Sequence, residues 1–186
     1  MKKTIKLMFA GVLAGLAALF APNSAGAAEK DVCLTAEGPN TYRLCVALKA
    51  QPAYEWTNPS GSKTGVPNGV TLIKELRREG QTPNRNAAGF RGSAQVLTEE
   101  YFDHKGGDRP QDDGGCLKAV NSETYVLCRA LWEQPSYDRE DGLSNPEGSE
   151  IVAELAEEGV TPSRNAGEFR RESRTETGEF FVRFRR

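Results

Sequence analysis

The sequence predicts a helix-rich α+β fold that is a tandem duplication of a small disulfide-stapled unit. Three observations predict it: two long segments recur along the chain, apolar residues recur at spacings of three and four, and the four cysteines fall at matching places. All-β repeats built from hairpins are the alternative, because the tyrosine, valine and threonine of the recurring segments also favour strands.

The recurrence extends over most of the chain. The 22 residues from Cys33 to Tyr54 recur 83 positions later, from Cys116 to Tyr137, with 12 identities. The 19 residues from Ile73 to Arg91 recur 79 positions later, from Val152 to Arg170, with 11 identities. Agreement over such lengths indicates one folded unit per copy.

These recurrences divide the chain into a leader and two units. We expect repeat unit 1 at 28–102, a linker at 103–115 and repeat unit 2 at 116–186. The linker is rich in aspartate and glycine, which is typical of a solvated connection.

Residues 1–27 have the three-part pattern of a secretory signal peptide. Three lysines precede an uncharged apolar run of 15 residues, Leu7 to Ala21, and Ala25-Gly26-Ala27 is an A-x-A cleavage sequence. The run is shorter than the roughly 20 apolar residues that span a bilayer, and an uncleaved anchor is the alternative. We expect cleavage after Ala27 and a secreted or periplasmic mature chain without a membrane span.

Charge and cysteine content restrict the partners. Removal of the leader takes away three of the 24 basic residues and none of the 26 acidic ones, so the net charge falls from −2 to −5. This negative charge disfavours nucleic acid as a partner. In an oxidising compartment the cysteines form disulfides, and one local bridge per unit predicts Cys33–Cys45 and Cys116–Cys128. Zinc is disfavoured because no C-x-x-C clamp is present.

Three helices are expected in each unit. Spacings of three and four predict a first helix from about Thr41 that ends before Pro52. A second helix is predicted over Val70 to Glu79, followed by a glycine C-cap. Thr82 as N-cap and Pro83 at the first helical position predict a short third helix that ends near Phe90 or Arg91.

Strands and loops complete the prediction. Alternation of Phe180, Val182 and Phe184 predicts a strand at the end of the chain, with an equivalent near 95–102 and a short partner at 33–36. Loops are predicted at 55–66 and, four residues shorter, at 138–145.

The residues do not indicate a catalytic constellation. His104 is the only histidine, it lies beside the linker, and its neighbours predict a solvated position. No phosphate-binding glycine motif is present, and Asp138 to Gly142 lacks the spacing of a calcium loop. We therefore expect a chain that is not an enzyme, with no cofactor and no metal.

Two recurring motifs supply candidate binding residues. Thr-Pro-x-Arg-Asn-Ala is a helix start, an exposed recognition point, or an inhibitory loop presenting arginine to a trypsin-like protease. Its candidates are Arg85, Asn86, Arg164 and Asn165. Tyr54 and Tyr137, in Gln-Pro-x-Tyr, are candidates for contact with a sugar or protein, with core packing as the alternative.

The expected function follows from duplication, export and the absence of catalytic motifs. We expect an exported, non-enzymatic binding protein that recognises an extracellular or envelope macromolecule, either protein or carbohydrate. The alternatives are a two-headed inhibitor of extracellular trypsin-like proteases and, third, a small secreted enzyme.

Overall fold

In the computed structural model, residues 31–104, 115–139 and 141–185 are described. The fold is predominantly helical with two short two-stranded sheets, so the predicted helix-rich α+β class is confirmed. The predicted signal peptide and most of the predicted linker, 105–114, lie outside the described residues.

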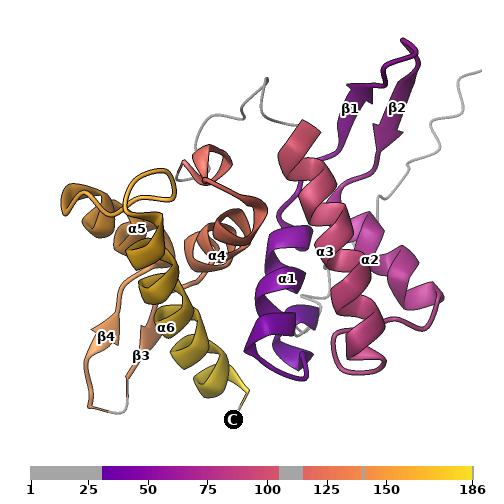
Figure 1. The fold of residues 1–186 in the computed structure, drawn as a ribbon. Coiled ribbons are helices and arrows are strands. Elements are labelled where there is room, and N and C mark those ends of the chain that lie inside the picture. The colour runs from indigo at the N-terminus through magenta and orange to yellow at the C-terminus, as the bar shows by residue number, and fades with distance from the viewer. Residues whose placement is uncertain (1–30, 105–114, 140, 186) are drawn as a thin grey trace, which may run out of the picture.

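The same order of elements occurs in both halves of the chain (Figure 1). The first half contains η1 (Val32–Thr35), α1 (Pro39–Lys49), β1 (Tyr54–Thr57), β2 (Lys63–Val66), α2 (Gly69–Arg78) and α3 (Ala87–His104). The second contains η2 (Cys116–Lys118), α4 (Ser122–Trp132), β3 (Tyr137–Asp138), β4 (Ser144–Asn145), α5 (Gly148–Glu157) and α6 (Ala166–Phe184).

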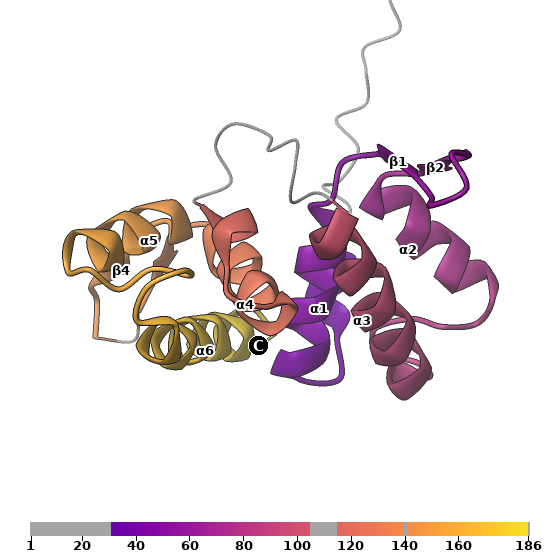
Figure 2. The same cartoon turned by 45° about the horizontal axis from the view of Figure 1, so that its top comes forward.

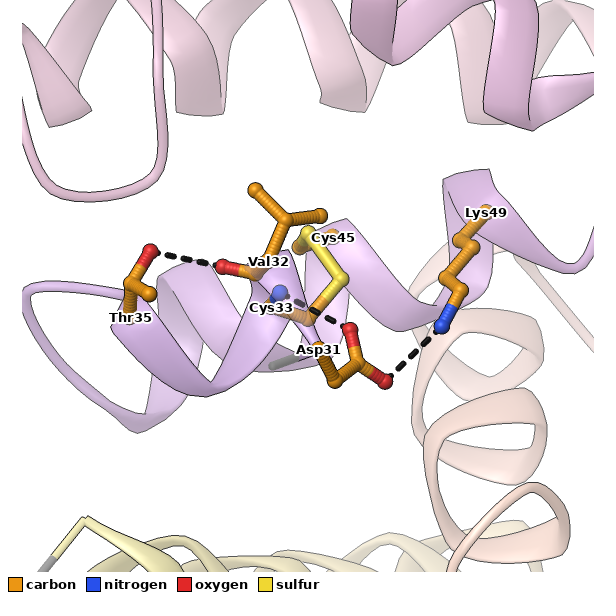
Figure 3. The surroundings of a disulfide bond; sticks show 6 residues. All are labelled: Asp31, Val32, Cys33, Thr35, Cys45 and Lys49. Carbon is orange, nitrogen blue, oxygen red and sulfur yellow. Dashed lines mark hydrogen bonds and ion pairs between the residues drawn. A yellow bond between two sulfur atoms is a disulfide. The ribbon is translucent and has the colours of Figure 1, made fainter. Parts of the chain in front are cut away.

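Disulfides connect the short 3-10 turn of each half to its first helix. The bonds are Cys33–Cys45 and Cys116–Cys128, the pairs that the sequence favours. In the first half, Asp31 accepts a hydrogen bond from Cys33 N at 3.0 Å and pairs with Lys49 at 2.8 Å (Figure 3). Closing a loop of this length stabilises the fold by about 3 kcal/mol in the chain-entropy model.

Two predicted helices lie close to their predicted places. The first helix ends at Lys49, before Pro52, and α2 ends just ahead of Gly80. Gly80 and Gly159 have φ of 79° and 77°, the left-handed conformation of a glycine that ends a helix.

The third helix differs from the prediction at its beginning. Thr82 and Pro83 do not start it: Arg85 N donates to Thr82 Oγ1 at 2.9 Å, and Thr82 N donates to Arg85 O at 2.9 Å. These bonds close a compact turn, and Asn86 then has a φ of 51°. Helix α3 begins only at Ala87, because the left-handed residue interrupts the helical path.

The predicted strands are wrong. Residues 95–102 and 180–184 continue α3 and α6, and 33–35 belong to η1. A period of two over so few residues is also compatible with helix, and the buried positions of α6, Phe169, Ser173, Thr177 and Phe180, recur every three or four residues. The predicted loops contain the strands instead, as hairpins that pair Tyr54 with Val66 and Tyr137 with Asn145.

The third helix of each half packs mainly on the first helix of its own half, and its C-terminal part also contacts the first helix of the other half. Tyr42 of α1 packs on Phe180 and Phe181 of α6, with ring centroids 5.8 and 5.3 Å apart. Tyr125 of α4 packs on Tyr101 and Phe102 of α3, at 5.9 and 5.5 Å. These two sets of residues occupy matched positions, 83 and 79 residues apart, so each half depends on the other for part of its core.

Candidate functional site

A groove lies where the two halves meet. Helices α1 and α4 run side by side in the middle of the molecule, with α3 beyond α1 and α6 beyond α4 (Figures 1 and 2). Side chains from all four helices line an open cavity of about 820 Å³. We call this cavity the central groove.

The lining of the central groove is mixed. Its aliphatic side chains are Leu44, Val126 and Leu127. Its polar and charged side chains are Asn40, Arg43, Arg91, Gln95, Glu99, Ser122, Glu123 and Arg174. Such a surface suits a ligand that has both apolar and polar groups.

Arg43 is the most deeply placed charge of the central groove. It is 8% exposed, and three of its nitrogens donate hydrogen bonds. Nε donates to Thr177 Oγ1 at 2.7 Å, Nη1 to Asn40 Oδ1 at 2.8 Å, and Nη2 to the Arg174 carbonyl at 2.7 Å. The bonds to α6 fix this guanidinium at the junction between the halves.

The charge of Arg43 has no counter-ion within the described part of the chain. All three acceptors are neutral, and no aspartate or glutamate there forms an ion pair with it. Burial lowers the pKa of the Arg43 guanidinium, and the positive charge of Arg174 lowers this pKa further. Arginine stays protonated despite such shifts, so an uncompensated positive charge lies beside the groove.

The remaining charges of the central groove have partners. Arg174, half-exposed, pairs with Glu123 across the α4–α6 contact. Arg91 pairs with Glu37 at 3.5 Å and donates to Thr41 Oγ1 at 3.1 Å. Gln95 donates to Glu99 at 2.9 Å. These surface pairs are individually weak, so a ligand can replace them at little cost.

The arginine motifs lie outside the central groove. Arg85, Asn86, Arg164 and Asn165 are exposed, on the turns that precede α3 and α6. These two turns are at opposite ends of the molecule in both views (Figures 1 and 2). The structure therefore does not bring the four residues together into one site.

Tyr54 and Tyr137 are part of the core. Each is 6% exposed, and burial raises the pKa of each phenol. Tyr54 packs edge-on against Tyr101, and Tyr137 packs edge-on against Phe180 at the matched position. This burial favours the core-packing alternative over contact with a sugar or protein.

His104 is exposed, as expected for a solvated histidine, but it also stacks on Trp56. The ring centroids are 4.3 Å apart and the rings are 6° from parallel. This stack ties the end of α3 to strand β1 of the first hairpin. The matched positions in the second half are Arg139 and Arg183, so the stack has no counterpart there.

The recurring motifs do not indicate Arg43, Gln95 or Arg174 of the central groove, because these positions differ between the two copies. Arg43 matches Val126, and Gln95 matches Arg174, so both pairs differ between the copies. One feature of the sequence could have indicated the groove: Arg43 of the first helix is replaced by Val126 in the otherwise similar helix of the second copy. This difference points to a shared groove only when the two helices are known to lie side by side.

Comparisons with protein-family models, with curated proteins and with solved structures give no match. In the described residues, no three histidine, cysteine, aspartate or glutamate side chains are arranged to hold a metal ion. The search of those residues for a helix long and apolar enough to cross a membrane also found none. The disulfides are compatible with a secreted or periplasmic protein.

Proposed function

We propose that this chain is an exported, non-enzymatic binding protein, formed by tandem duplication, that holds an extracellular or envelope macromolecule in the central groove. The observation that carries the proposal is the groove itself, an open cavity of about 820 Å³ lined by helices of both halves. The proposal of export rests on the signal-peptide pattern of residues 1–27.

The composition of the central groove supports binding in preference to catalysis. The groove residues do not include histidine, cysteine or lysine, and its carboxylates Glu99 and Glu123 accept hydrogen bonds from Gln95 and Arg174. General acid-base work needs a titrating group poised near the operating pH. Aliphatic, amide and guanidinium groups instead supply contact area and directional hydrogen bonds.

A groove made by both halves also gives the proposed duplication a functional reason. A single unit supplies only α1 and α3, or only α4 and α6, and therefore only part of the lining. Two joined units supply all four helices in one chain. Because the two units differ in sequence, they can contribute different groups to one asymmetric ligand.

The inhibitor of trypsin-like proteases is the second candidate, because Arg85 and Arg164 are exposed. The turn before each is closed by hydrogen bonds between Thr82 and Arg85, and between Thr161 and Arg164. Inhibitory loops are extended, so these compact turns are less suitable. Inhibition of trypsin by the purified chain would favour this candidate.

The proposed function is tested by capturing partners from culture medium or envelope extract with the chain from residue 28 onward. Val126→Trp fills the central groove with a large ring and should abolish capture. Val96→Trp is the matched control, since Val96 is 54% exposed on α3 and does not line the groove. Equal capture by both variants, or loss by both, would refute the groove as the binding site.

A further inference from the structure

We infer that the central groove binds an extended peptide segment that carries one or two carboxylates beside aliphatic side chains, with Arg43 and Arg174 receiving a carboxylate. This inference rests on the proposed function and specifies its ligand. Arg43 is buried beside the groove, and all three acceptors of its hydrogen bonds are neutral.

Arg43 has more donors than partners. A guanidinium has five N–H groups, and Arg43 uses three of them, on Thr177, Asn40 and the Arg174 carbonyl. In the described part of the chain the other two have no acceptor, although the residue is 8% exposed. Buried charges are normally paired, because an isolated ion loses its hydration without compensation. An anionic ligand group supplies the missing partner.

Arg174 adds a second guanidinium to this part of the central groove, and this one is exposed to solvent. Its side chain is 50% exposed, it lines the groove, and its own carbonyl accepts the hydrogen bond from Arg43. The two guanidinium groups are close enough for Arg174 to lower the pKa of Arg43. A carboxylate placed between them accepts charge-assisted hydrogen bonds and relieves this repulsion.

The other groove residues favour a peptide with few charges over a polyanion. Glu99 and Glu123 are also in the lining, and they repel a dense run of sulfates or phosphates. Leu44, Val126 and Leu127 offer aliphatic contacts that a polysaccharide cannot use fully. Asn40, Gln95 and Ser122 can bond the peptide groups of an extended chain.

The test measures fluorescence anisotropy of defined probes with the chain from residue 28 onward. The first probe is a labelled peptide of alternating leucine and glutamate with two glutamates, and the second has glutamine in their place. Heparin is the third probe and represents a polyanion. We expect the glutamate peptide to bind about tenfold more tightly than the glutamine peptide, and more weakly as salt rises.

Two arginines of α6 provide matched variants. Arg174→Gln removes the guanidinium but keeps the carbonyl that holds Arg43, and should weaken the glutamate peptide about tenfold. Arg171→Gln makes the same charge change outside the groove, where Arg171 pairs with Glu168 and Glu172, and should leave affinity within about twofold. Circular dichroism confirms that both variants are folded.

Three outcomes would overturn the inference. They are equal binding of the two peptides, equal loss in both arginine variants, and binding of heparin without binding of the glutamate peptide. None of these outcomes refutes the proposed function, because the groove can still capture a partner of different chemistry. The proposed function is refuted separately, if Val126→Trp and Val96→Trp have the same effect on capture.

Discussion

The two halves of the molecule use the same framework but contribute different side chains to the central groove. Framework residues match between the halves, including the disulfides and the glycines that begin α2 and α5. Arg91 donates to Thr41 at 3.1 Å, and Arg170 donates to Thr124 in the same way at 3.0 Å. Two pairs of positions at the groove do not match, because Arg43 corresponds to Val126 and Gln95 to Arg174. Packing constrains both halves in the same way, whereas a shared groove lets each half supply a different group.

The hairpins extend this contrast. The strands of the first hairpin have four residues each and those of the second have two. Trp56 stacks on His104 beside the longer hairpin, whereas Arg183 donates to the Asp138 carbonyl at 3.3 Å beside the shorter one. The hairpins thus differ in length and in contacts, whereas the disulfides and the glycines that begin α2 and α5 are the same in both halves.

The largest expected effect is at the first residue of α2 and α5. A Cβ at Gly69 would lie 1.6 Å from the Leu48 carbonyl oxygen, and one at Gly148 would lie 1.6 Å from that of Leu131. Gly69→Ala and Gly148→Ala should each destabilise by more than about 3 kcal/mol in urea unfolding, because backbone must move. Gly92→Ala, with open space around it, is the control and should stabilise α3 slightly. A large loss in only one half would break the equivalence of the frameworks.

A second comparison tests how the halves share their cores. Phe181 is 3% exposed and packs on Tyr42, so Phe181→Ala should cost about 3 to 5 kcal/mol. Phe102, at the matched position, is only half-buried against Tyr125, and Phe102→Ala should cost less. Because these contacts join the halves, unfolding followed by near-ultraviolet circular dichroism should remain a single transition. Separate transitions of the two halves would contradict the shared core.

The third prediction concerns alkaline pH and the buried phenol of Tyr42. Burial raises the pKa of Tyr42 far above its ordinary value, so the folded protein keeps this proton when the unfolded chain loses it. Its contribution is present in full below about pH 10 and is lost progressively as pH rises toward the folded pKa. At pH 11 the loss is roughly 1.4 kcal/mol for this group. Tyr42→Phe should flatten the decline between pH 9 and 11, and an unchanged slope would contradict the assignment.

The smallest effects are expected in the two arginine turns. Thr82→Ala and Thr161→Ala each remove the acceptor of a 2.9 Å hydrogen bond and should destabilise by about 1 kcal/mol. Arg85→Ala and Arg164→Ala alter exposed side chains and should cost under about 0.5 kcal/mol. Capture of the partner should survive all four changes. Loss of capture in the arginine variants would move the binding site from the groove to these turns.

The helical framework could largely be predicted from the sequence because its causes are local. Spacings of three and four placed α1 and α2, and glycine marked the end of α2. The Thr-Pro motif misled, because Thr82 caps a closed turn through Arg85 N instead of a helix. The last residues of α6 misled as well, since alternation over five residues cannot distinguish a strand from the end of a helix. Of the three alternating residues only Phe180 is buried, whereas Val182 and Phe184 are exposed.

The sequence by itself determined the helix-rich class, the disulfide bonds and the recurrence of one framework, all of which depend on residues close together in the chain. Only the tertiary structure decided that the C-terminal parts of α3 and α6 also contact the first helix of the opposite half, and that Arg43 meets Thr177 and the Arg174 carbonyl where the halves meet. These residues are more than 130 positions apart. Their encounter depends on how apolar faces pack in three dimensions, and no local pattern records which face meets which.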